Sequence, residues 1–216
     1  MIPEFWRERW QEGRIGFNQS DVNPLLRQYF SHLKLPVGSR VFVPLSGKSI
    51  DMVWLAAQGY EVVGVELVES AVHAFFAEQH ITPTITDHDD MTCYQGVLEG
   101  QTITLWVGDI FVLTTDDIGH IDAVYDRAAL IAMPPDMRPK YSEQVRTLSG
   151  GAPQLLLTLN YDQNEWAGPP FAVSSEHVAQ DYGQHYQLTK LSDAPATLNA
   201  ASTMAVTEQV WVLERV

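Results

Sequence analysis

One stretch, residues 41–66, constrains the fold more than any other part of the chain. It opens with an apolar run at 41–43 that is typical of a buried strand, and a turn containing Pro, Ser and Gly follows at 44–49. Apolar residues at helical spacing predict a helix over 50–58, and a second β-branched strand follows at 62–65. We therefore predict a β-α-β unit, whose parallel strands are joined by a right-handed crossover.

The turn of this unit predicts a ligand site, because open α/β sheets bind ligands at the carboxyl edge of their strands. Gly47 allows the backbone to approach a ligand closely. Glu66 ends the second strand, where an acidic side chain can accept hydrogen bonds from both hydroxyls of a ribose. We predict a pocket for a nucleoside-containing cofactor; the alternative is a β-α-β unit with a surface glutamate and no ligand.

The glycine pattern narrows the kind of nucleoside. Gly-x-Gly-x-x-Gly, which cradles a pyrophosphate, occurs nowhere in the chain. Residues 46–49 resemble the end of a phosphate-binding P-loop, but Phe42 stands where that motif requires glycine. A cofactor without phosphates fits better, and we predict S-adenosylmethionine. A nucleotide-binding oxidoreductase is the alternative enzyme class, and a catalytically silent S-adenosylmethionine-binding protein is the non-enzymatic alternative.

Composition limits the partners and the compartment. A chain of 216 residues suits one domain with a sizeable core, and a formal net charge of −14 disfavours nucleic acid and anionic membranes as partners. The single cysteine, Cys93, excludes an intrachain disulfide and fits a reducing compartment. The sequence has neither a signal-peptide pattern nor an apolar run of membrane-spanning length. We expect a cytoplasmic monomer.

The rest of the chain alternates strands with helices, which predicts an α/β fold with a mostly parallel sheet and an antiparallel end. Further strands are expected at 103–107, 121–125, 154–159, 184–191 and 205–214, and helices at 3–10, 21–33 (capped by Asp21), 68–80 and 136–148, with another starting near Ser174. Residues 82–100 are interpreted as a polar, irregular insertion. Its acidic run at 87–90 is interpreted as a solvated loop rather than a metal site, and no metal is expected.

Three side chains at predicted strand ends are candidates for the site. Asp109 can accept a hydrogen bond from the exocyclic amine of adenine, or it can serve as a turn or cap residue. Arg127 is the one cation placed close to the pocket; it can hold a carboxylate of the cofactor or substrate, or pair with Asp126 or another local acid. Trp166 lies in a loop that walls the substrate side. The N-terminal aromatics form either a lid over a flat ligand or part of the core.

Together, these segments closely resemble the thiopurine S-methyltransferase family in its bacterial form. The resemblance is carried by residues 5–6, 9–10, 16–17, 43–52, 64–66, 108–109, 125–130 and 157–161. It is specific, because Pro-Leu-Ser-Gly-Lys at 44–48 replaces the glycine-rich turn of most methyltransferases. The resemblance implies the seven-stranded methyltransferase fold, with helices on both faces of the sheet. It also implies methyl transfer from S-adenosylmethionine to the sulfur of aromatic or heterocyclic thiols such as thiopurines, and a link to selenium and tellurium compounds.

The resemblance also implies roles for individual residues. The family positions that bind S-adenosylmethionine correspond to Trp10, Leu45, Glu66 and Arg127, and the adenine-contacting stretch corresponds to Asp109 and Ile110. Phe17 corresponds to an aromatic that faces the substrate, which Arg127 also reaches. This favours the lid interpretation, with residues 1–35 forming a helical lid and 36–216 the α/β core of a single domain.

Two positions depart from the family pattern. Ser46 stands where the family often has Cys, and residues 198–206 lack the basic side chains that many relatives carry before the last strand, which bears on substrate choice. The expected reaction is in-line displacement by a thiolate sulfur. Because such thiols ionise readily, we expect their methylation to require no strong general base. We expect Arg127 to hold an anionic group near the sulfonium.

Overall fold

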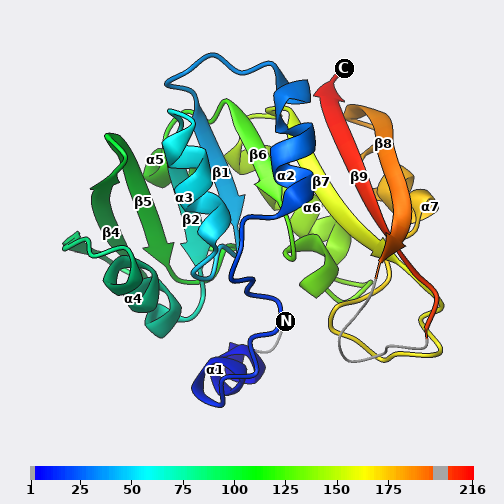
Figure 1. Cartoon of the computed structure of the whole chain (residues 1–216), viewed down its shortest axis with the longest axis horizontal. Helices are drawn as coiled ribbons and strands as arrows, with labels where there is room; N and C mark the ends of the chain where they lie inside the picture. The colour runs from blue at the N-terminus through cyan, green and yellow to red at the C-terminus, as the bar shows by residue number, and fades with distance from the viewer. Residues whose placement is uncertain (1–2, 197–203) are drawn as a thin grey trace.

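The computed structural model describes residues 3–196 and 204–216, and within them one nine-stranded sheet forms the centre of the molecule (Figure 1). The strands are β1 Arg40–Pro44, β2 Glu61–Glu66, β3 Thr84–His88, β4 Met91–Leu98, β5 Gln101–Val107, β6 Ala123–Asp126, β7 Gln154–Asn160, β8 Tyr186–Ala196 and β9 Val206–Arg215. The α-helices are α1 Pro3–Gln11, α2 Pro24–Tyr29, α3 Ile50–Ala57, α4 Glu69–Glu78, α5 Thr115–Ile118, α6 Arg138–Leu148 and α7 Ser175–Tyr182. Two 3-10 helices cover Phe30–Leu33 and Leu130–Ala132.

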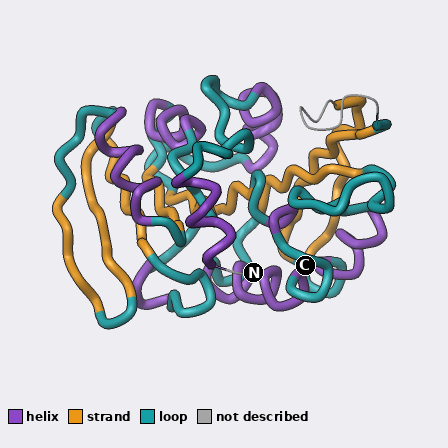
Figure 2. Tube along the Cα trace, turned by 90° about the horizontal axis from the view of Figure 1, so that it is seen from below, coloured by secondary structure: helices purple, strands orange, loops and turns teal. Residues whose placement is uncertain are grey.

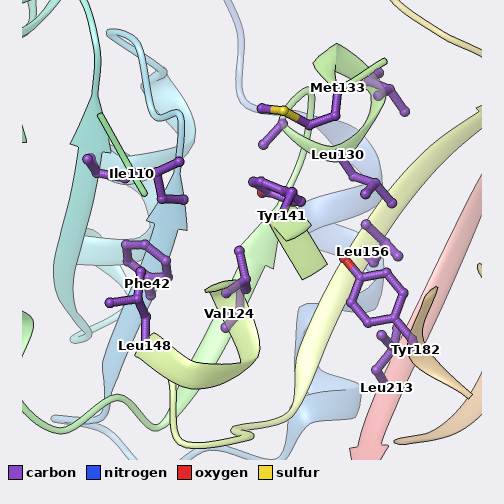
Figure 3. Packing of buried hydrophobic residues seen from close by; sticks show 14 of the residues in the cluster. Phe42, Ile110, Val124, Leu130, Met133, Tyr141, Leu148, Leu156, Tyr182 and Leu213 are labelled. Atoms are coloured by element: carbon purple, nitrogen blue, oxygen red, sulfur yellow. The ribbon is translucent and has the colours of Figure 1, made fainter. Parts of the chain in front are cut away.

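Helices cover both faces of this sheet, which makes three layers (Figure 2). One apolar cluster joins the sheet to α2, α3 and α4, and a second joins it to α5, α6 and α7. In the second cluster, Phe42 and Val124 lie on strands and Tyr141 on α6 (Figure 3). Because helices α2 to α7 bury one face each against the sheet, the ends of the strands stay free to build a site.

The strand order is β3-β4-β5-β2-β1-β6-β7-β9-β8. Strands β5, β2, β1, β6 and β7 run parallel, so their carboxyl ends meet at one edge. The predicted β-α-β unit is confirmed, as are the α/β class and the antiparallel end, where β9 lies between β7 and β8. The sheet therefore brings residues that follow β1, β2 and β6 to a common edge.

Two sequence-based predictions about local structure are wrong. The sheet has nine strands rather than seven, because the expected irregular insertion at 82–100 contains β3 and β4, a hairpin that pairs with β5. All of β3 is exposed at the sheet edge, so its polar sequence lacks the apolar signal of a buried strand. The helix expected at 21–33 begins only at Pro24, with Asn23 rather than Asp21 as its cap, and continues as a 3-10 turn.

The Asn23 cap is well defined. Its side-chain oxygen accepts hydrogen bonds from the backbone N–H groups of Leu25 and Leu26, at 2.8 and 3.4 Å. These bonds satisfy N–H groups that the first turn of a helix leaves without an intrahelical partner. Every helix within residues 3–196 and 204–216 is too short or too polar to cross a lipid bilayer.

Candidate active site

A cavity of about 480 Å³ lies at the carboxyl edge of the parallel strands. Figure 1 shows α1 beyond this edge, on the side to which the arrows of β1, β2 and β6 point. Seven of the residues predicted for the site line this cavity: Trp10, Phe17, Leu45, Gly47, Glu66, Arg127 and Trp166. The tertiary structure therefore brings the N-terminal aromatics together with the strand ends.

Glu66 lies at the end of β2 and lines the cavity. It is 7% exposed, and its carboxylate accepts hydrogen bonds from the backbone N–H groups of Gly47 and Val68, both at 2.9 Å. Burial raises the pKa of the Glu66 carboxyl, and these amide donors oppose that shift. One carboxylate thus fixes the turn after β1 and the start of α4, and it keeps lone pairs for hydroxyl donors in the cavity.

The turn after β1 requires an unusual backbone. Leu45 and Gly47 both have positive φ, at 48° and 53°. A Cβ atom at Gly47 would lie 3.3 Å from the Trp10 ring, closer than an ordinary contact. Glycine therefore serves both the backbone conformation and the approach of α1 to the turn.

Arg127 is held by a buried network rather than by its neighbour Asp126. Its Nε donates to Asp51 Oδ2 at 2.9 Å, and its Nη1 donates to the backbone oxygen of Phe17 at 3.1 Å. Asp51 is 1% exposed and also accepts from the Asn23 backbone N–H at 2.8 Å and from the Tyr125 hydroxyl at 3.0 Å. The acid that pairs with Arg127 is therefore neither Asp126 nor another acid close in the sequence but Asp51, 76 positions away, which ties the N-terminal segment to the strand edge. A guanidinium has five N–H donors, so Arg127 keeps some for a ligand.

Several buried polar atoms at the cavity have no hydrogen-bond partner among the described residues. They are Trp6 Nε1, Arg9 Nε, Ser46 Oγ and Trp166 Nε1, and all four residues line the cavity. Buried polar groups are normally satisfied. Their concentration here fits a cavity that receives a polar ligand, and together with the Glu66 acceptor they fit a nucleoside with an amino-acid arm.

Asp109 and Ile110 lie outside this main cavity. They line a small neighbouring cavity that shares Leu45 with it. The Asp109 carboxylate accepts a hydrogen bond from the Phe111 backbone N–H at 3.0 Å, the turn role that the sequence left open. Because this bond occupies one carboxylate oxygen, the other stays available, and the adenine-contacting role stays a prediction.

The sequence reasoning missed several lining residues. Arg127 is not the only cation near the pocket, since Arg9 on α1 also lines it. The helical spacing of α1 could have indicated Arg9, because Trp6, Arg9 and Trp10 fall on one face of the helix. No residue of α1 is buried, so its aromatics are not core residues. Glu208, Thr158 and Ile131 also line the cavity, and no pattern in the sequence indicates them.

The remaining candidates contribute no second site. Burial raises the pKa of the Cys93 thiol, which disfavours the reactive thiolate. The acidic run at 87–90 spans the hairpin between β3 and β4. Within residues 3–196 and 204–216, no group of three His, Cys, Asp or Glu side chains is arranged to hold a metal ion.

Asp126 turns away from the cavity into the core. Its carboxylate is fully buried and accepts from the Leu130 backbone N–H at 3.0 Å and from the Tyr141 hydroxyl at 2.7 Å. Burial raises its pKa from 3.8 to about 6. Because the folded pKa lies above the unfolded one, this group lowers the stability of the protein as pH rises between those values.

We therefore expect Asp126→Asn to change the pH dependence of stability. Relative to the unaltered protein, the variant should gain roughly 2–3 kcal/mol of unfolding free energy between pH 4 and pH 6.5. Urea denaturation at several pH values measures this difference, with the exposed Asp116→Asn as control. A difference that stays constant with pH would contradict the assignment.

The comparisons with known proteins agree on one family. A family model described as thiopurine S-methyltransferase matches residues 1–216. A thiopurine S-methyltransferase of Psychrobacter cryohalolentis is 64% identical over the whole of both chains, and one of Gluconobacter oxydans is 44% identical over 96% of this chain and 92% of its own. This chain belongs to the thiopurine S-methyltransferase family. Membership confirms the resemblance found in the sequence, the methyltransferase class and the S-adenosylmethionine cofactor.

A solved structure confirms the fold. A Burkholderia thailandensis N1-methyltransferase with bound S-adenosylhomocysteine has a TM-score of 0.67 and 15% identity, covering 99% of this chain and 86% of its own. At that identity the likeness shows the fold alone. The predicted S-adenosylmethionine-dependent methyltransferase fold is therefore confirmed for this family member, with the strand number corrected.

Proposed function

We propose that this protein transfers a methyl group from S-adenosylmethionine to the sulfur of an aromatic or heterocyclic thiol, thiopurines among them. The observation that carries the proposal is a single cavity that joins Glu66 at one end to Arg127, Phe17 and Trp166. The first residue suits a ribose, and the others suit a flat, anionic partner. Family membership supports the reaction. It also disfavours the oxidoreductase alternative, as does the absent glycine fingerprint.

The residues of the chain bind and orient the two molecules. S-adenosylmethionine, when bound, supplies an electrophilic methyl group. Glu66 accepts hydrogen bonds from ribose hydroxyls, and Arg127 holds a carboxylate or thiolate with its free N–H groups. Trp6, Trp10 and Phe17 exclude water from the sulfur, so residues 1–35 act as a lid. The protein's contribution is therefore mainly orientation and a dry site.

Arg127→Ala tests the anion-holding role. We expect it to lose about 1.5–3 kcal/mol of charge-assisted hydrogen bonding in the transition state, which corresponds to roughly a 10- to 150-fold fall in kcat/KM. Steady-state kinetics with S-adenosylmethionine and a thiopurine measure this, with the exposed Arg27→Ala on α2 as the matched control. Wild-type kinetics for both substrates in Arg127→Ala would refute the role.

A substrate screen tests the proposed function itself. Thiopurines, aryl thiols, selenite and tellurite are each incubated with S-adenosylmethionine, and methylated products are identified by mass spectrometry. We expect turnover of thiols, with metalloids as further substrates. S-adenosylmethionine binding without any turnover would instead support the catalytically silent alternative. We further propose a cytoplasmic monomer with no nucleic acid partner, which size-exclusion chromatography with light scattering and cell fractionation test.

A further inference from the structure

A second glutamate, Glu208, lines the cavity and has no role in the reaction as proposed so far. It sits near the start of β9, opposite Leu159 of β7, and its half-buried side chain lines the cavity. Among the residues that the structure describes, its carboxylate has no hydrogen-bond or ion-pair partner. Its oxygen atoms therefore keep their lone pairs available to a ligand in the cavity.

Glu208 lies at the substrate end of the cavity. In the sheet, β1, β6 and β7 separate β2 from β9. Four strand spacings of about 4.8 Å place Glu208 roughly 19 Å from Glu66. Arg127 follows β6 and lies between the two carboxylates. If Glu66 holds the ribose of the cofactor, Glu208 lines the far end of the same cavity, where a second molecule would bind.

Glu208 is not the charge partner of Arg127. The guanidinium forms its ion pair with Asp51, at a distance of 2.9 Å. No ion pair within 4.0 Å joins Arg127 to Glu208. Arg127 still influences it, because burial raises the pKa of the Glu208 carboxyl and the nearby cation opposes that shift. The cavity that Glu208 lines also contains apolar side chains, Leu157, Trp166 and Pro169 among them. Such surroundings strengthen a hydrogen bond to a ligand.

The chemistry of heterocyclic thiols supplies a role for such a group. Many of them exist as thiones, with the proton on a ring nitrogen beside the C=S carbon. Alkylation of that sulfur requires the N–H proton to leave. An aryl thiolate has no such proton, so it needs no acceptor. A carboxylate at the substrate end therefore matters for the first class of substrate and not for the second.

We propose that Glu208 binds the ring N–H of a heterocyclic thione and acts as the base that accepts its proton; this rests on the proposed function. As the thione sulfur forms its new bond to the methyl carbon, the bond from that carbon to the sulfonium sulfur of S-adenosylmethionine breaks, its electron pair leaves with S-adenosylhomocysteine, and the C=S double bond becomes single. The N–H electron pair forms the ring C=N bond, and the proton passes to the Glu208 carboxylate. Solvent then removes this proton. Glu208 thereby makes heterocycles with an N–H beside the sulfur the preferred substrate class.

The test compares Glu208→Gln with the unaltered protein on two substrates. Benzothiazole-2-thione carries one ring N–H, and thiophenol carries none. We expect kcat/KM for the thione to fall by about 100-fold or more, the usual contribution of a general base, while thiophenol kinetics change little. The exposed Glu214→Gln on the same strand is the matched control. Equal effects on both substrates, or none, would overturn the proposal.

A binding measurement gives a readout independent of turnover. Calorimetry compares benzothiazole-2-thione with its N-methylated analogue, which has no N–H. We expect the unaltered protein to prefer the N–H form by about tenfold or more, the value of a charge-assisted hydrogen bond, and Glu208→Gln to lose that preference. A preference that persists in the variant would reflect size and would refute the role of Glu208. Absence of methylation of both sulfur substrates by the unaltered protein would refute the proposed function as well.

Discussion

Asp51→Ala is expected to lower the free energy of unfolding by about 3–5 kcal/mol and to remove most methyltransferase activity. The carboxylate is buried and holds three groups: the Arg127 guanidinium, the Tyr125 hydroxyl and the Asn23 backbone N–H. Removing it leaves a largely buried guanidinium without its counter-charge, and two donors without an acceptor. Chemical denaturation and steady-state kinetics measure the two effects.

A double-mutant cycle separates lost charge pairing from general damage. If the buried ion pair causes the loss, the double variant Asp51→Ala/Arg127→Met should lose less unfolding free energy than the two single variants lose in sum. Strict additivity would show that the pair has little part in stability. The exposed Asp136→Ala is the control, and we expect it to change stability by less than about 0.5 kcal/mol.

Glu66→Ala is expected to weaken S-adenosylhomocysteine binding by about 100-fold or more. The variant removes the acceptor proposed for two ribose hydroxyls, and hydrogen bonds to a charged group contribute about 1.5–3 kcal/mol each. It also frees the Gly47 and Val68 amides, so the turn after β1 loses its fixed position. Isothermal titration calorimetry measures the affinity.

Two controls accompany the Glu66 experiment. Glu61→Ala changes an acid at the opposite end of β2, away from the cavity, and should leave binding unchanged. Circular dichroism shows whether Glu66→Ala is folded, and Glu66→Gln, which keeps the shape and an acceptor oxygen, should bind more tightly than Glu66→Ala. Undiminished affinity in both Glu66 variants would remove this residue from the cofactor site.

Sequence patterns predict those parts of the fold that depend on interactions within a short segment of the chain. Gly47 follows the first strand and Glu66 ends the second, so the β-α-β crossover alone predicts that they meet at one edge, and they hydrogen-bond there. The hairpin of β3 and β4 was missed because an exposed edge strand needs no apolar pattern and is stabilised by pairing with its neighbour. The predicted segment without basic residues, 198–206, falls largely outside the described residues.

The sequence by itself determined the family, the α/β class and the cofactor edge, because strand and helix periodicity and the turn motif are encoded within short segments. The tertiary structure alone decided the partners of the charged residues. Asp51 and Arg127 are 76 positions apart and meet only because β1 and β6 are neighbours in the sheet. Glu208 reaches the same cavity because β9 inserts beside β7. Such contacts depend on strand order, which local propensity does not specify.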